Sequence, residues 1–450
     1  MQDSILFYKS IRGASHLMTG KPCQDHSIAY QNDDVKIVVV CDGHGGNTYF
    51  RSDVGAKLAA ETAVQLLCEF ARCVPPSTFN GIEFSITAQP KKNPFIDADG
   101  NKLRFDELSE DQKQLAIQAQ SYIDSEGKFP QQQGIVKDLL SMILKQWMYV
   151  IEQDARNRPF DKKEKKVLSG LGIEKAYGCT LLAFLQTKDY WLSFHIGDGK
   201  IFLCNQTLTW SNPVPEDCTC FLNYTTSLCD NNPLIEFRYA FNGKGEVPLA
   251  VMLCSDGLDG SLRTNDNIQD FYEQVLSLGL DGDDIESELE GYLPSLSESG
   301  NKDDVSLAGI INLSFIDQTS LRKQMEIAKC SRNIRNDYRN KKAEIESIRN
   351  RIDVLSMKYE RTKDARFEKQ TDLDEMRQLI KSREKEVSDL DKSVDLLRKE
   401  IDELRSDLKI KETDFNNWKF TVKNEMAELE SAQNDIASEE NDSHHTFITW

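Results

Sequence analysis

The 450-residue sequence lacks the features of a membrane protein, a disulfide scaffold or a zinc site. It holds 11 cysteines but no Cys-x-x-Cys pair, and its closest pair is Cys218-Thr219-Cys220. Most cysteines interrupt apolar runs, where a thiol behaves as a small hydrophobic group. No run reaches the ~18 apolar residues of a membrane-spanning helix. The first residues, MQDSILFYKS, lack the basic and apolar regions of a signal peptide. These absences predict a reduced, cytoplasmic protein with no membrane partner.

The first part of the chain is also short of positive charge. Residues 1–320 carry 28 Lys and Arg against 45 Asp and Glu, whereas residues 321–450 carry 27 against 29, so most of the net charge of -19 lies in the first part. Such a surface repels phosphodiester backbones and anionic lipid. We therefore expect no nucleic-acid partner. Acids gathered in one place would instead suit a hard cation.

Residues 1–317 have the pattern of a globular domain with a mixed α and β core. Short β-branched runs at 35–40, 181–185, 191–196 and 249–253 predict strands, and the stretches 54–70 and 135–153 predict helices. Between about 75 and 134 the prolines and the glutamine run at 131–133 indicate a surface insertion.

The remaining chain is predicted to be a coiled coil over 318–435, followed by a flexible tail over 436–450. No glycine follows Gly309 and no proline follows Pro294. A seven-residue repeat places apolar residues at position a throughout, with Arg366 as the exception. The apolar a positions are Ile345, Ile352, Tyr359, Leu373, Ile380, Val387, Val394, Ile401, Leu408, Phe415, Val422 and Leu429.

The composition of this repeat predicts how it assembles. From Val387 to Leu404 the a positions are β-branched and the d positions are leucine, which favours two parallel strands. We expect a parallel homodimer, or a coil with a different protein. With no glycine or proline to turn the chain back, residues 345–429 should form a rod on the order of 130 Å at ~1.5 Å per residue.

Acidic residues stand at the ends of the apolar runs. Asp42 follows VVVC, Asp198 follows WLSFHIG, Asp256 follows VMLCS, and Asp303 and Asp304 precede VSLAGII. A single Asp-Gly after a strand is usually a turn, but four such places indicate carboxylates that meet at one edge of a sheet. These acids would repel one another unless a positive charge lay among them. Oxygen ligands without a His or Cys cluster favour Mg²⁺ or Mn²⁺.

An ordered set of motifs gives the chain a family resemblance. GKPCQDHS, VVVCDGHGG, SDVGAKLA, GCTLL, HIGDGKI, LCSDGL and KDDVSL follow one another between residues 8 and 314. In this the chain resembles the metal-dependent serine/threonine protein phosphatases of type 2C, especially their bacterial-type members. The resemblance implies an α+β fold, a four-layer α-β-β-α sandwich of two antiparallel sheets, here followed by a long coiled-coil helix.

The resemblance also implies roles for individual residues. Asp42 would bridge two metal ions, the Gly43 carbonyl would bind one of them, and Asp256 and Asp303 would complete the other ion's shell. Asp25 would hold the water ligands of the ions, and Asp198 with Asp256 would form a possible third metal position. In the family, water activated by two Mg²⁺ or Mn²⁺ ions attacks the phosphorus of phosphoserine or phosphothreonine. His44 would protonate the departing oxygen.

The chain departs from the family pattern at two places. Many members carry an arginine before the first-motif acid, where this chain reads HLMTGKPCQD. The candidates to bind the substrate phosphate are Lys21, Arg12 and His16. Asp304 stands where the family usually has an asparagine, so that it would either accept hydrogen bonds around the metal ligands or add charge to them.

Three functions are compatible with these motifs. The first is an active phosphatase of phosphorylated proteins, dimerised or targeted by its coil. The second is a catalytically silent phosphatase-like scaffold that acts through the coil, and the third is a hydrolase of small phosphoesters. The complete set of acids favours an active enzyme over the scaffold, since a silent copy needs none of them.

Overall fold

The computed structural model describes residues 4–87, 127–214, 225–313, 317–375 and 380–440, with several residues between 102 and 124. The chain divides into two compact units, Met1–Met325 and Glu326–Trp450. The boundary falls inside helix α9 (Gln318–Glu375), because Leu321 is buried in the core of the first unit. None of the described helices is long and apolar enough to cross a membrane.

The first unit is built on two antiparallel sheets. In the described residues, one sheet has the order β1-β11-β10-β7-β8 and the other the order β2-β3-β5-β6-β9-β4. The strands of the first sheet are β1 (Ser4–Ile11), β7 (Lys200–Cys204), β8 (Trp210–Ser211), β10 (Ala250–Cys254) and β11 (Val305–Asn312). Those of the second are β2 (His26–Gln31), β3 (Lys36–Cys41), β4 (Glu83–Ile86), β5 (Leu181–Gln186), β6 (Trp191–Ile196) and β9 (Arg238–Asn242).

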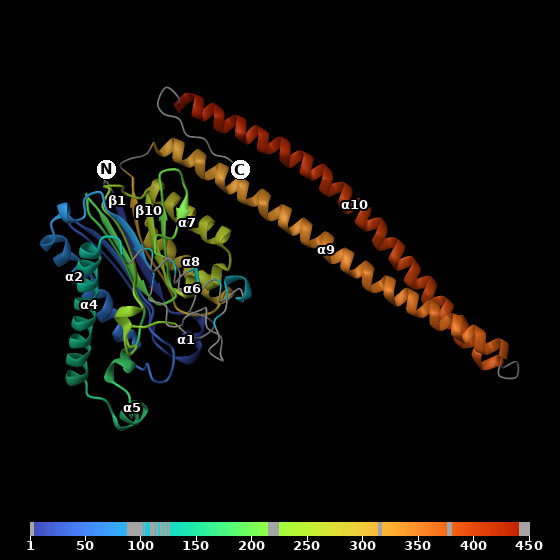
Figure 1. Ribbon diagram of the computed structural model, residues 1–450, viewed down its shortest axis with the longest axis horizontal. Helices are drawn as coiled ribbons and strands as arrows, with labels where there is room; N and C mark the ends of the chain where they lie inside the picture. The colour runs from blue at the N-terminus through green and yellow to red at the C-terminus, as the bar shows by residue number, and fades with distance from the viewer. Residues whose placement is uncertain are drawn as a thin grey trace. The chain divides into compact units, whose positions relative to one another are not determined.

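Side-chain alternation along the strands produces the four layers. In β3, Ile37 and Val39 pack with the helices on the outer face, whereas Val38 and Val40 pack against the other sheet. Because both faces are covered, the strand is apolar throughout, as its sequence indicated. Helices lie on the outer face of each sheet (Figure 1), which confirms the predicted α-β-β-α sandwich.

The outer helices belong to the two faces as follows. The second sheet is covered by α2 (Ser52–Cys73) and α4 (Pro130–Asn157), and the first sheet by α6 (Asp256–Leu262), α7 (Asn265–Asp281) and α8 (Ile285–Ser299). The short helices include α1 (Ala14–Thr19), α5 (Lys162–Val167) and the 3₁₀ turn η3 (Ile173–Tyr177). The predicted helices over 54–70 and 135–153 thus lie within α2 and α4.

The segment read as a surface insertion has a place in the core at both of its ends. Near its start, β4 pairs with β9, and Phe79 is fully buried against Phe241 with the ring centroids 4.1 Å apart. At its end, α4 begins at Pro130. The central part, including residues 88–101, lies outside the described residues.

The second unit contains two long helices that pack side by side in an antiparallel pair, α9 and α10 (Ile380–Glu440) (Figure 1). In the part of the chain that the structure describes, four ion pairs join them, and from residues 344–349 to residue 366 of α9 the partner in α10 moves back from residues 411–412 to residue 391. They are Glu344–Lys411 at 2.6 Å, Arg349–Glu412 at 2.8 Å, Arg351–Glu400 at 3.2 Å and Arg366–Asp391 at 2.8 Å.

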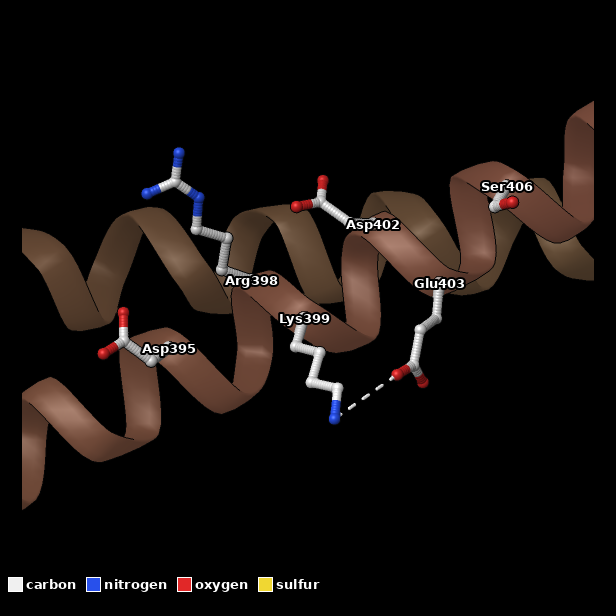
Figure 2. Close-up of a pocket in the computed structure, with 6 residues that line it drawn as sticks. All are labelled: Asp395, Arg398, Lys399, Asp402, Glu403 and Ser406. Atoms are coloured by element: carbon white, nitrogen blue, oxygen red, sulfur yellow. Dashed lines mark ion pairs between the residues drawn. The ribbon is translucent and has the colours of Figure 1, made fainter.

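The heptad repeat correctly identifies the buried seam of this pair. Ile345, Val394 and Ile401 at a positions and Leu397 at a d position are buried, whereas Val354 and Met357 at outer positions are exposed. Outer positions of α10 carry charges of both signs (Figure 2), such as the pair Lys399–Glu403 at 3.9 Å. A charged surface at the outer positions is typical of a coiled coil.

The C-terminal part is helical as predicted, but it is not one uninterrupted helix, so the extended rod predicted for residues 345–429 is wrong. Helix α9 ends at Glu375 and α10 begins at Ile380, so the apolar seams of the two helices face each other within one chain. A heptad repeat requires that the seam be covered by another seam, and it does not require that the cover come from a second chain. The absence of glycine and proline therefore did not prevent the chain from reversing.

Candidate active site

The acids singled out in the sequence lie at the ends of strands from both sheets. Asp25 precedes β2, Asp42 follows β3, Asp198 lies between β6 and β7, Asp256 begins α6 directly after β10, and Asp303 precedes β11. One carboxylate oxygen from each of Asp42, Asp198 and Asp256 lies within 4.8 Å of the others. Three of the acids that the sequence analysis singled out, which come from distant parts of the sequence, thus lie close together in the structure.

Backbone pairing fixes the segment that carries Asp42. Its N–H donates to Thr180 Oγ1 at 2.9 Å, and its carbonyl accepts from the Thr180 N–H at 2.8 Å. The next residue, Gly43, forms a bridge with Cys179. A Cβ at Gly43 would collide with the backbone carbonyl of Gln24, so only glycine lets the Asp25 loop approach the Asp42 loop this closely.

Burial and mutual repulsion raise the pKa of the clustered acids. At Asp25, Asp42 and Asp256 the largest cause is burial. The second is the negative charge of a neighbouring acid: Asp304 acts on Asp25, Asp25 acts on Asp42, and Asp198 acts on Asp256. The pKa of Asp256 rises to about 6, and those of Asp25 and Asp42 lie well above their ordinary range. Protein groups alone therefore keep part of this cluster protonated.

Two buried oxygens show that these residues fit a divalent cation. Asp25 Oδ2 and Asp256 Oδ1 are buried and have no hydrogen-bond partner in the part of the chain that the structure describes. Buried carboxylate oxygens without donors are costly unless a cation binds them. The donor set is entirely oxygen, which suits Mg²⁺ or Mn²⁺ rather than a softer metal.

Asp303, a predicted ligand, lies beside this cluster. It is exposed, its Oδ1 accepts from the Asp304 N–H at 2.9 Å, and its charge adds to the raised pKa of Asp256. It is not one of the three acids whose oxygens lie within 4.8 Å of one another.

Asp304 is a buried anchor for the loop that carries Asp25. It is 3% exposed, and its Oδ1 accepts from the Gly13 N–H at 2.6 Å and contacts His16 Nδ1 at 2.9 Å. Its Oδ2 accepts from the Gln24 N–H at 2.6 Å. Both oxygens face donors, so the amide of an asparagine would turn an N–H₂ group toward one of them. An aspartate at this position can therefore accept from both the Gly13 and the Gln24 N–H groups.

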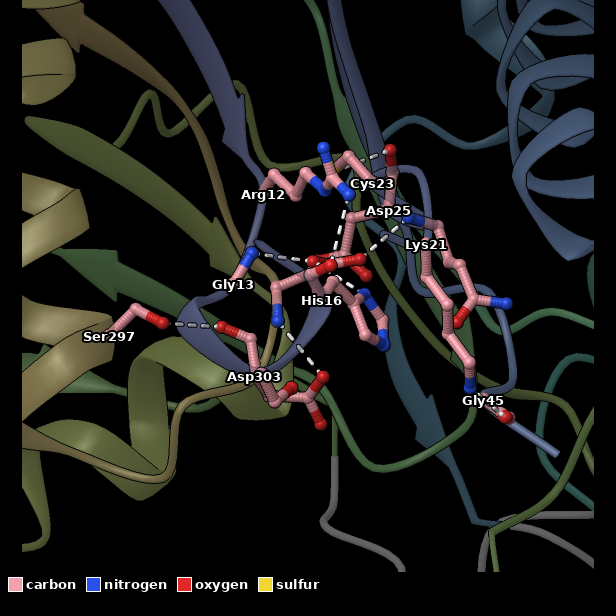
Figure 3. Close-up of polar contacts among 12 residues, drawn as sticks. Arg12, Gly13, His16, Lys21, Cys23, Asp25, Gly45, Ser297 and Asp303 are labelled. Atoms are coloured by element: carbon pink, nitrogen blue, oxygen red, sulfur yellow. Dashed lines mark hydrogen bonds and ion pairs between the residues drawn. The ribbon is translucent and has the colours of Figure 1, made fainter. Parts of the chain in front are cut away.

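The three cations considered for substrate phosphate are placed differently from one another (Figure 3). Arg12 Nη2 donates to the His16 carbonyl at 2.9 Å, and the His16 ring is buried against Asp304. Both side chains thus contact the loop or Asp304, although the buried Arg12 Nε has no hydrogen-bond partner among the described residues. Lys21 is exposed, and its Nζ donates to the Gly45 carbonyl at 2.9 Å, next to His44.

His44 is held on several sides. Its N–H donates to the Gly178 carbonyl at 3.1 Å, and its ring lies edge-on to Tyr49 with the centroids 4.8 Å apart. Gln24, which the sequence analysis did not identify, also holds this residue: its Nε2 donates to the His44 carbonyl at 3.0 Å and to Ser52 Oγ. Burial lowers the pKa of His44 to about 4.

The comparison with protein families agrees with this geometry. The model of the family described as protein phosphatase 2C matches residues 12–294. The chain belongs to the protein phosphatase 2C family. It is therefore a member of a family of serine/threonine protein phosphatases, which are hydrolases of phosphate monoesters. A comparison with curated proteins found no significant match.

Several solved structures of phosphatases are similar to this chain. PppA, titled a key regulatory component of T6SS in Pseudomonas aeruginosa, is 15% identical with a TM-score of 0.39, covering 69% of this chain and 98% of its own. The PstP catalytic domain, titled as a complex with 2 manganese ions, is 14% identical with a TM-score of 0.36, covering 68% and 97%. The S. agalactiae serine/threonine phosphatase is 15% identical with a TM-score of 0.36, covering 69% and 100%.

For this phosphatase 2C chain, we expect that removing divalent cations makes stability fall as pH rises. The pKa of Asp256 is raised from 3.8 to about 6, so between these values the folded state binds more protons than the unfolded state. The free energy of unfolding then decreases with pH, and the raised pKa values of Asp25 and Asp42 extend the decrease. Thermal unfolding in EDTA between pH 5 and 8 measures this.

Two comparisons isolate the contribution of the cluster. Mn²⁺ should raise the unfolding temperature more at pH 8 than at pH 5, because it replaces protons on the acids. In EDTA at pH 8, Asp42→Asn should unfold at a higher temperature than the wild type, while Asp33→Asn, at an exposed position, should not. An unfolding temperature in EDTA that is the same for Asp42→Asn and the wild type across this range would contradict the expectation.

Proposed function

We propose that the chain is an active, metal-dependent phosphatase of phosphoserine and phosphothreonine in proteins. The observation that carries the proposal is the cluster of Asp42, Asp198 and Asp256, whose oxygens lie within 4.8 Å of one another in a member of the phosphatase 2C family. Burial raises the pKa values of Asp42 and Asp256, an arrangement with no benefit for a scaffold.

Each residue would have a separate task. Asp42, the Gly43 carbonyl, Asp256 and Asp303 would hold two Mg²⁺ or Mn²⁺ ions, with Asp25 beside them. Asp198 would serve a third position together with Asp256. When bound, the ions would supply a water nucleophile of lowered pKa and neutralise charge on the phosphoryl oxygens. His44 would donate a proton to the departing serine or threonine oxygen.

One assay separates this proposal from the other two functions. The purified chain is given a phosphothreonine peptide and p-nitrophenyl phosphate, each with Mn²⁺ and with chelator. Hydrolysis of both substrates that is lost in chelator supports the proposal. Hydrolysis of p-nitrophenyl phosphate alone favours a small-phosphoester hydrolase, and no turnover in Mn²⁺ favours the silent scaffold.

The coil is better explained as a self-contained hairpin than as a dimer seam. The buried a and d residues Ile345, Val394, Leu397 and Ile401 are covered within one chain. We therefore expect full-length protein at micromolar concentration to scatter light as a monomer of 51.3 kDa. A dimeric mass that dissociates when Ile401 is replaced by aspartate would restore the homodimer.

A further inference from the structure

A phosphatase of this family needs a cation for the substrate phosphate, and a lysine far from the first motif is well placed. Lys175 lies in η3 (Ile173–Tyr177), directly before the residues that pair with the Asp42–His44 segment. The Gly178 carbonyl accepts from the His44 N–H at 3.1 Å, and the Thr180 N–H donates to the Asp42 carbonyl at 2.8 Å. The backbone thus brings Lys175 to the His44 side of the site.

The ammonium group of Lys175 has capacity for another acceptor. In the part of the chain that the structure describes, its Nζ lies 3.7 Å from Asp230 Oδ1 and 3.8 Å from Cys229 Sγ. An ammonium–carboxylate hydrogen bond is normally ~2.7 to 2.9 Å long, and the group has three donors. Burial raises the pKa of the Cys229 thiol, so a neutral sulfur faces the cation. The side chain is 22% exposed and open to a ligand.

Asp230 is fixed in position, so that it can orient the lysine. Its Oδ2 accepts from the Ser227 N–H at 3.0 Å, which leaves Oδ1 directed toward Lys175. The segment is tied in turn to Cys179, whose carbonyl accepts from Ser227 Oγ and from the Leu228 N–H, each at 3.0 Å. Asp230 is therefore attached to the same backbone that pairs with Gly43.

Residues around Gly178 connect the segment that carries Lys175 with His44. A Cβ on Gly178 would meet Cys229 Sγ and Tyr49 Cδ1, each at 2.7 Å, and the Tyr49 ring contacts the His44 ring. Lys175 and Asp230 act in opposite directions on the pKa of His44. Both charges therefore lie within electrostatic range of the imidazole.

We propose that Lys175, oriented by Asp230, binds the phosphoryl group of the substrate. This proposal rests on the proposed phosphatase function and assigns to Lys175 the task that the sequence left among Lys21, Arg12 and His16. Arg12 and His16 are engaged with the loop and Asp304. An incoming phosphate dianion would replace the long contacts of Lys175 with shorter, charge-assisted hydrogen bonds. A lysine supplies charge without the planar fork of arginine.

The test compares Lys175→Met with Lys21→Met in Mn²⁺-loaded full-length protein. For Lys175→Met, we expect the KM for p-nitrophenyl phosphate and the inhibition constant of inorganic phosphate to rise roughly tenfold or more, with a smaller change in kcat. Lys175→Arg should recover most of the phosphate affinity. The exposed control Lys166→Met should stay within about twofold of the wild type, since surface charges contribute little. Lys21→Met, which tests the alternative assignment, should raise both constants less than Lys175→Met does.

Calorimetric titration of inorganic phosphate into the Mn²⁺-loaded protein tests Lys175 separately from turnover. If the wild type binds phosphate and Lys175→Met does not, the assignment stands even when the chain hydrolyses nothing. Equal binding by both proteins, an effect of Lys21→Met alone, or no binding by the wild type would overturn it. Circular dichroism and the unfolding temperature confirm that each variant is folded.

Discussion

Replacing Asp42 or Asp256 by asparagine should reduce turnover by several orders of magnitude while leaving the fold intact. Each change removes one charge from a cluster whose oxygens lie within 4.8 Å of one another. Generation of the nucleophile and neutralisation of phosphoryl charge depend on the same ions, so both fail together. The measurement is kcat on p-nitrophenyl phosphate in saturating Mn²⁺, with Mn²⁺ affinity determined by calorimetry.

The matched control is an acid that lies outside the cluster. Asp33 is exposed, and Asp33→Asn should keep wild-type kcat and Mn²⁺ affinity. Near wild-type activity in both Asp42→Asn and Asp256→Asn would refute the metal-site assignment. A loss of activity in Asp42→Asn or Asp256→Asn could not be attributed to unfolding, because removing a buried charge should stabilise the metal-free domain.

The sandwich could be predicted because its signals are local and repeated. Continuous apolar runs such as that of β3 arise when a strand is covered on both faces, and Val38 and Val39 indeed face different layers. Acids at the ends of such runs were expected to meet, since neighbouring strands end at a common edge. The order of the motifs along the chain indicated the family, and the family resemblance implied the four-layer arrangement.

The hairpin could not be predicted from the seam alone. A heptad repeat has the same a and d pattern in parallel and antiparallel pairs, within one chain or between two. The flanking charges hold the additional information. Arg349 and Glu412 both stand at e, and Arg351 and Glu400 both stand at g, so like positions face each other. This like-to-like pairing belongs to antiparallel helices, and it was present in the sequence.

The contacts around Asp304 and Lys175 could not be predicted from the sequence, for a different reason. Asp304 accepts from Gly13 and Gln24, and Lys175 lies near Asp230. Each contact joins segments whose proximity depends on strand pairing, and no short motif contains both partners. A side chain that holds a loop and one that binds substrate look alike until their partners are known.

His44→Ala should lower kcat on a phosphothreonine peptide roughly 10² to 10⁴-fold, and much less on p-nitrophenyl phosphate. The threonine alkoxide is a poor leaving group and needs a proton, whereas nitrophenolate departs readily without one. In the free protein, burial lowers the pKa of His44 to about 4, so its imidazole is neutral near pH 7. A bound phosphate dianion favours the imidazolium and raises this pKa.

The pH dependence of the activities of the wild type and of His44→Ala tests whether His44 acts as a proton donor. Because the protonated fraction of His44 falls as pH rises, the ratio of wild-type to His44→Ala activity on the peptide should decrease with pH. The decrease in kcat, which reports the substrate complex, should occur at higher pH than the decrease in kcat/KM, which reports the free enzyme. On p-nitrophenyl phosphate the ratio should stay nearly constant. Equal losses on both substrates, independent of pH, would instead mean that His44 only maintains the loop through its contacts with Tyr49 and Gly178.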